Sequence, residues 1–379
     1  MPTVPLTDAD CQEAYDAWVA HGRNVTRAAS ALGMSNGKLA HRVRVYEKRQ
    51  GIDPAVRNAQ VAAGTDMVPK LAWVKTKSED GASYSVMLKP EEPGPVDYAE
   101  DLRAALEGLT TAPAINPPSS VMSELCTVYP AMDMHLGMQA WGRETGSADY
   151  NLDLAAQDVE HAFAKVMAYT PPSDTAVFLL PGDTFHADDN RAETPQSKHK
   201  LDVDTRHWKV LDSGIQIVDA AIQRLLGKHH NVIVRVMRGN HDEHSHLVLS
   251  FALSERFRDH ERVTIEKTPR DLFMMQWGKA AIFAHHGDKA KPQQLALYLS
   301  DVCPFWSETR HRYALTGHVH HDQAKDVGPL RWESLRAFCP PDAYAASMGY
   351  GARRALQSLT FDKTDGLVLR AIDPIERAA

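Results

Sequence analysis

The chain has little cysteine and no two cysteines in close spacing. Its four cysteines are Cys11, Cys126, Cys303 and Cys339, so neither a zinc ribbon nor a disulfide framework is expected. No run of about 18 apolar residues is present, which argues against a transmembrane helix. The first residues also lack the basic start and apolar core of a signal peptide. We therefore expect a cytoplasmic protein without a membrane partner.

Acidic residues outnumber basic ones overall, but positive charge is locally dense. The 379 residues carry a formal net charge of -7, which excludes a protein that coats nucleic acid along its whole length. From Arg23 to Gln50, however, seven Lys or Arg residues stand against one acid, Glu47. DNA contact is therefore expected in this one region.

This basic segment has the pattern of a helix-turn-helix. Apolar residues favour one helix around Ala28 and Leu32 and a second around Leu39 and Val43, joined by a turn at Gly33. It resembles the modules of transposases and Fis-type regulators. That resemblance implies DNA contacts through Asn36, Lys38, His41 and Arg42, with phosphate contacts through Arg44, Lys48 and Arg49. The alternative is a three-helix bundle that only docks on the rest of the chain.

We predict three regions. Residues 1–51 form the helix-turn-helix module. Residues 52–123 contain a β-hairpin around Asp80-Gly81, a helix over residues 96–109 and a Pro-rich linker, with the main boundary in that linker. Residues 124–379 alternate apolar strands with amphipathic helices, which indicates an α/β catalytic domain. In such folds ligands bind beyond the carboxyl ends of the strands.

Five apolar runs of this last region end in polar tips. The tips are Asp133-x-His135, Gly182-Asp183-x-x-His186, Gly239-Asn240-His241-Asp242, His285-His286-Gly287 and Gly317-His318-x-His320. So many oxygen and imidazole ligands exceed one tetrahedral zinc but suit two adjacent ions. Mixed nitrogen and oxygen ligands without thiolate favour Mn, Fe or Zn over copper and calcium.

The ordered set resembles the calcineurin-like metallophosphoesterase superfamily. The resemblance implies a four-layer α/β/β/α sandwich that binds two divalent ions, for which we expect Mn2+, with Fe, Zn, Ni and Mg as alternatives. One ion would take Asp133, His135 and His320, and the other Asn240, His286 and His318. Asp183 would bridge them. Some nuclease members have the fourth ligand one residue earlier, so His285 stays open as an alternative to His286.

The resemblance also implies the chemistry. A metal-bridged hydroxide would attack phosphorus, His241 would contact the phosphate or protonate the leaving oxygen, and Asp242 would orient the His241 ring. The histidine of the second block, His186, is similar to the one that contacts the scissile phosphate in SbcD-type repair nucleases.

We therefore expect a DNA phosphodiesterase, either an exonuclease or an endonuclease. The arrangement is also similar to nuclease-like proteins of phages and prophages, which would place it in the host cytoplasm. A homodimer is compatible with these features. The alternatives are an enzyme for small nucleotides or other phosphoesters, and a DNA-binding regulator whose metal domain is not catalytic.

Overall fold

The computed structural model describes residues 6–50, 72–77, 83–88, 106, 109–351 and 353–376. The chain divides into two compact units, Met1–Val96 and Asp97–Ala379. No helix in the described ranges is long and apolar enough to cross a membrane.

The N-terminal unit begins with three short helices: α1 (Asp8–Ala20), α2 (Val25–Ala31) and α3 (Asn36–Arg49). Each starts directly after a residue whose side chain accepts a backbone N–H of the first turn, namely Thr7, Asn24 and Ser35. Their apolar faces meet in a small core made of Ala14, Trp18, Ala28, Ala29, Leu39 and Val43. Helices α2 and α3 thus form where the spacing predicts them.

The same unit contains the predicted hairpin. Strand β1 (Ala72–Lys77) pairs antiparallel with β2 (Ser83–Leu88), from Ala72 opposite Leu88 to Lys77 opposite Ser83. The Asp80-Gly81 turn and most of the predicted helix over 96–109 lie outside the described residues.

Two sheets form the centre of the second unit. The first has the order β13-β12-β3-β4-β5-β6 and the second the order β10-β11-β9-β8-β7. The strands of the first sheet are β3 (Met122–Pro130), β4 (Ser173–Leu180), β5 (Asn231–Val236), β6 (Val263–Ile265), β12 (Leu356–Asp362) and β13 (Gly366–Asp373). Those of the second are β7 (Phe273–Trp277), β8 (Ala280–His285), β9 (His311–Thr316), β10 (Gln323–Val327) and β11 (Leu330–Ser334).

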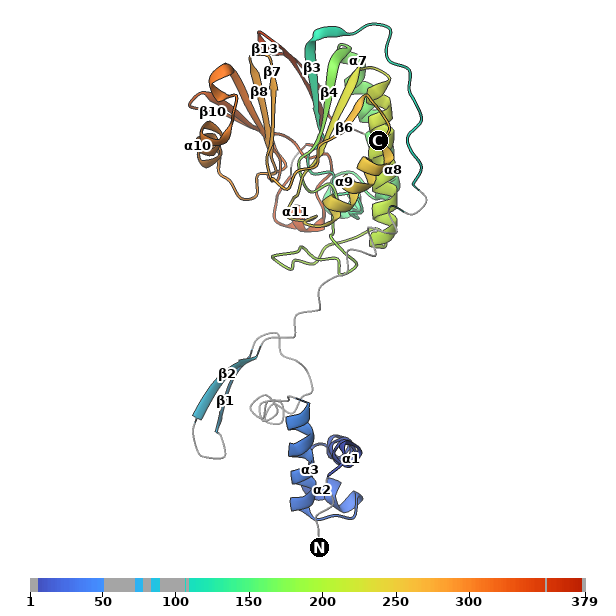
Figure 1. Cartoon of the computed structure of the whole chain (residues 1–379), viewed down its shortest axis with the longest axis vertical. Coiled ribbons are helices and arrows are strands. Elements are labelled where there is room, and N and C mark those ends of the chain that lie inside the picture. The colour runs from blue at the N-terminus through green and yellow to red at the C-terminus, as the bar shows by residue number, and fades with distance from the viewer. Residues whose placement is uncertain are drawn as a thin grey trace. The chain divides into compact units, whose positions relative to one another are not determined.

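Helices cover the outer faces of both sheets, as Figure 1 shows. The large helices are α7 (Leu152–Tyr169), α8 (His207–Leu226) and α9 (Ser245–Arg256) on the first sheet and α10 (Pro292–Val302) on the second. Short helices are α6 (Gly142–Thr145), α11 (Ala343–Ser347) and a 3-10 turn at Trp306–Glu308. Separate apolar clusters fill the three interfaces, including one between the sheets around Val128, Leu179 and Ile282. This layering confirms the predicted α/β/β/α sandwich.

The Pro-rich segment differs from the linker that we predict. Leu109, Ala112 and Ile115 pack against the core beneath the helices of the first sheet. Arg256 donates a hydrogen bond to the Thr110 carbonyl (2.6 Å), and Arg262 does so to the Ile115 carbonyl (2.7 Å). The second compact unit therefore begins upstream of residue 124, because this segment has its carbonyls satisfied by that unit.

Candidate metal centre

The polar tips follow five strands whose carboxyl ends carry the candidate ligands. Strands β3, β4 and β5 run parallel in one sheet, and β8 and β9 run parallel in the other. The tips deliver Asp133 and His135 after β3, Asp183 and His186 after β4, Asn240 and His241 after β5, His286 after β8, and His318 and His320 after β9. Because these neighbouring strands are parallel, their carboxyl ends bring residues that are distant in sequence to the same edge of the sheet.

The backbone is strained where these ligands stand. Asp133, His135, Asp183, His318 and His320 all have φ between 46° and 67°. They are five of the nine non-glycine residues with positive φ in the described ranges. Such conformations cost about 1–3 kcal/mol each and persist where a site requires them.

Two glycines make room for the carboxylates. A Cβ atom at position 239 would overlap the Asp183 carboxylate, and one at position 317 would overlap that of Asp133. The motif glycines therefore let the backbone of one tip approach the acid of another.

A first cluster joins Asp133, His135 and Asp183, whose ligand atoms all lie within 4.8 Å of one another. His320 Nε2 lies 3.6 Å from Asp133 Oδ1, and the His318 N–H donates to the Asp133 carboxylate at 3.0 Å. His135 is 3% exposed and its Nε2 has no hydrogen-bond partner. A buried nitrogen without a hydrogen-bond partner beside two carboxylates fits the role of a metal ligand.

A second cluster joins Asp183, His286 and His318. The His286 Nδ1–H donates to the Pro181 carbonyl at 3.0 Å, which leaves Nε2 pointing at two oxygens: Asn240 Oδ1 at 3.0 Å and Asp183 Oδ2 at 3.2 Å. Oxygens and a nitrogen lone pair repel one another unless a proton or a cation lies between them. Asp183 belongs to both clusters, so it occupies the bridging position.

The fourth block presents two adjacent histidines with different surroundings. His286 lies in the second cluster, whereas the His285 Nδ1 accepts the Gly287 N–H at 2.9 Å. The geometry thus favours His286 over His285 as the ligand of this block.

Burial sets the charge state of the rings. Burial and the nearby His241 hold the pKa of His135 well below its usual range, and burial and His286 lower that of His318. Burial also lowers the pKa of His286, but the Asp183 carboxylate outweighs it and raises the value to about 10. Neutral rings ligate metals, and a cation beside Asp183 would replace the proton on His286.

Asp242 contacts the backbone of two strand tips through its side chain. Its carboxylate is fully buried and accepts four backbone N–H groups, those of Asp183, Thr184, Phe185 and Gly239. The His241 ring is oriented instead by its Nδ1–H, which donates to the His186 carbonyl at 2.8 Å. In this structure the Asp242 carboxylate fixes the loop that carries Asp183, and the role predicted for it towards the His241 ring stays a prediction.

His186 is buried with its ring next to the His135 ring. Its ring is 1% exposed, its Nδ1 lies 3.1 Å from His135 Nδ1, and its Nε2 has no hydrogen-bond partner. The phosphate contact predicted for His186 stays a prediction, and in this structure the ring is buried against that of His135.

Cys339 is the residue near these clusters that the sequence patterns do not indicate. Its sulfur and the ligand atoms of His135 and His320 lie within 4.8 Å of one another. It stands in the connection between β11 and α11, outside the motif blocks, so no spacing could reveal it.

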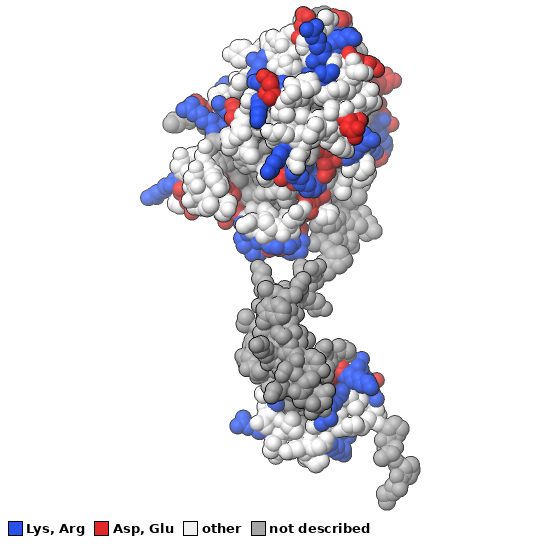
Figure 2. Space-filling model, turned by 90° about the vertical axis from the view of Figure 1, so that its left-hand side faces the viewer, with Lys and Arg blue, Asp and Glu red and all other residues white. Residues whose placement is uncertain are grey.

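The predicted DNA-contacting residues of α3 divide into two sets. Asn36, Lys38, His41, Arg44 and Lys48 are exposed. Arg42 is half-buried and Arg49 is exposed, and both pair with acids of α1, Arg42 with Asp10 at 3.1 Å and Arg49 with Asp8 at 2.5 Å. These two arginines hold α3 to α1, which reduces their availability for phosphates. The view in Figure 2 shows more Lys and Arg than Asp and Glu on the described part of this unit.

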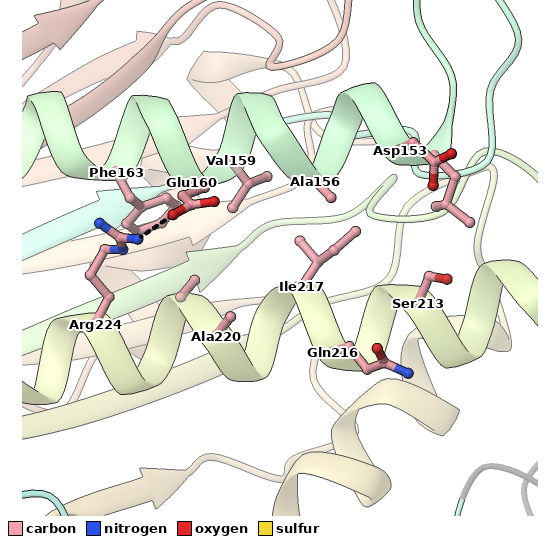
Figure 3. Close-up of a pocket in the computed structure, with 12 residues that line it drawn as sticks. Asp153, Ala156, Val159, Glu160, Phe163, Ser213, Gln216, Ile217, Ala220 and Arg224 are labelled. Atoms are coloured by element: carbon pink, nitrogen blue, oxygen red, sulfur yellow. Dashed lines mark hydrogen bonds and ion pairs between the residues drawn. The ribbon is translucent and has the colours of Figure 1, made fainter.

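Two surface hollows differ in their relation to the clusters. One of about 720 Å³ adjoins Gly287 and Gly317 and is lined by Lys289, Lys291 and Lys325. The other, about 470 Å³, lies between α7 and α8 (Figure 3), where Glu160 and Arg224 pair across it at 3.2 Å. Only the first lies beside a candidate ligand.

Comparison with known proteins gives remote likenesses. No family model matches the chain, and no curated protein matches it. Among solved structures, an archaeal phosphodiesterase is similar over 65% of this chain and 99% of its own, at 12% identity and a TM-score of 0.34. Vps29 of Entamoeba histolytica in complex with zinc is similar over 66% of this chain and 99% of its own, at 12% identity and a TM-score of 0.25. A predicted phosphoesterase of Streptococcus pneumoniae is similar over 63% of this chain and 84% of its own, at 13% identity and a TM-score of 0.26.

Proposed function

We propose that this protein is a two-metal phosphodiesterase that hydrolyses DNA. The observation that carries the proposal is the shared position of Asp183 between two clusters of nitrogen and oxygen ligands. The seven candidate ligands come from five strand tips, and five of these residues adopt a left-handed backbone conformation. A structural role would not require that strain.

The donor set fits two divalent ions. The unpaired Nε2 of His135 and the His286 Nε2 aimed at two oxygens are sites that a cation would complete. The first ion would be held by Asp133, His135 and His320, the second by Asn240, His286 and His318, with Asp183 on both. When bound, such ions activate a water molecule and neutralise phosphate oxygens.

His241 supports the reaction as a proton donor. Its Nδ1 is fixed by the His186 carbonyl, so the remaining ring nitrogen, Nε2, is available to substrate. Its ring centroid lies 4.6 Å from that of His135, which places it beside the first cluster. From there it can hydrogen-bond a phosphate oxygen or protonate the leaving oxygen.

Two features favour a polymeric substrate. The lysine-lined hollow beside Gly287 and Gly317 is suited to the phosphates that flank a scissile bond. The exposed Lys38, Arg44 and Lys48 of α3 add a second group of cations in the N-terminal unit.

The test compares substrates and one variant. With manganese, the protein should cut end-labelled linear DNA and turn over bis-p-nitrophenyl phosphate faster than the monoester, and Asp183→Asn should abolish both activities. Diester turnover without DNA cleavage would move the assignment to small nucleotides. Binding of DNA without any turnover, unchanged in Asp183→Asn, would make the protein a regulator.

A further inference from the structure

Cys339 is held between the two loops that carry the first cluster. The segment after β11 donates three backbone hydrogen bonds: Ala337 to the His320 carbonyl at 3.4 Å, Phe338 to that of Met132 at 2.7 Å, and Cys339 to that of Asp133 at 3.3 Å. One side of this segment therefore follows the β9 tip and the other the β3 tip. The position of the thiol is fixed by the same backbone that positions His320 and Asp133.

The thiol faces nitrogen ligands rather than only apolar neighbours. Its sulfur and the ligand atoms of His135 and His320 lie within 4.8 Å of one another, and the residue is 4% exposed. The unpaired, buried Nε2 of His135 is an independent sign that this space takes a ligand. The other three cysteines are absent from the metal-compatible clusters found in the described ranges. Core packing alone explains burial of Cys339, but it does not explain the unpaired nitrogen beside it.

We infer that Cys339 supplies a thiolate to the ion held by Asp133, His135 and His320. The inference rests on the proposed metal centre. Burial and the Asp133 carboxylate raise the pKa of the Cys339 thiol well above its usual range, so the thiol would release its proton to solvent only where an ion takes its place on the sulfur. The two ions then differ, because the second retains only nitrogen and oxygen ligands from Asp183, Asn240, His286 and His318.

A thiolate changes which metals the first position prefers. Soft sulfur ligands select zinc and iron, whereas manganese and magnesium prefer oxygen. The sequence-based expectation of manganese assumes a site without thiolate. With Cys339 as a ligand, the first position would bind zinc or iron in preference to manganese, whereas the second would lack that preference for a soft metal.

X-ray absorption at the zinc edge tests this on the full chain loaded with two equivalents of zinc. A sulfur scatterer at about 2.3 Å is expected in the wild type, one sulfur shared over the two ions. It should disappear in Cys339→Ser and remain in Cys303→Ala, since Cys303 ends α10 in a separate apolar cluster. The wild-type spectrum alone decides the matter if Cys339→Ser does not fold.

Metal titration separates the failure of this inference from that of the centre. Cys339→Ser should bind zinc at the first position at least about tenfold more weakly, while its manganese affinity changes much less. Two bound zinc ions with no sulfur scatterer would overturn the thiolate and leave the centre standing. No bound ion would overturn both.

Discussion

Gly182→Ala is a sharp test of how the second cluster is built. Gly182 has φ of +100°, and a Cβ added there would lie 2.6 Å from His286 Nδ1, the atom that donates to Pro181. The added Cβ would also lie 2.7 Å from the Arg238 carbonyl oxygen and 2.8 Å from Gly239 Cα. An ordinary contact begins at 3.4 Å, so the His286 ring and the backbone of the β5 tip must shift by up to 0.8 Å. Misplacing a reacting group by about 1 Å costs up to about 100-fold in rate. The backbone conformation adds about 1–3 kcal/mol of destabilisation.

The assay measures three quantities on the same variant: the free energy of unfolding in urea, zinc affinity by calorimetry, and turnover of bis-p-nitrophenyl phosphate. Gly146→Ala is the matched control, because its φ is +68° and its Cβ would contact nothing within 4 Å. We expect both variants to lose stability, but only Gly182→Ala to lose affinity at one of two ions and turnover. Wild-type affinity and turnover in Gly182→Ala would refute the role of His286.

Three further predictions follow from other parts of the molecule. Burial lowers the pKa of His229 to about 4, below the ordinary 6.5, so the folded protein resists protonation. Because the unfolded chain binds a proton at His229 first, the free energy of unfolding should fall by about 3 kcal/mol as pH drops from 6.5 to 4. His229→Gln should reduce this pH dependence, and the same dependence in the variant would contradict the assignment to His229. Replacing Lys38, Arg44 and Lys48 by Ala should lower the salt dependence of DNA binding by up to about 3 in log–log slope, with small-diester turnover preserved; an unchanged slope would exclude this face. Asp242→Asn should destabilise the protein by roughly 1–3 kcal/mol for each N–H left unpaired, and unfolding at the wild-type urea concentration would argue against that role.

Patterns that local chemistry controls were readable from the sequence. The strand tips could be predicted because a buried strand needs an apolar run, and polar residues directly after it stand at the sheet edge. The helices of the N-terminal unit follow from their caps and apolar spacing, as at Ser35 before α3.

Features that depend on contacts between distant segments were not readable. Cys339 lies near His135 because backbone hydrogen bonds join the segment after β11 to the β3 and β9 tips. No periodicity in the sequence predicts those hydrogen bonds. Asp242 stands next to His241 in the chain, yet its carboxylate accepts three N–H groups of the Asp183 loop and that of Gly239, which all need an acceptor. Arg42 carries the same charge as Lys38, and only packing against Asp10 distinguishes them.

The most direct test of the central claim is anomalous diffraction from crystals of the full chain grown with manganese or zinc. The proposal predicts two ions about 3.5–4 Å apart, with Asp183 bound to both and His286, not His285, on the second. A single ion, ions that do not share Asp183, or binding elsewhere would contradict it.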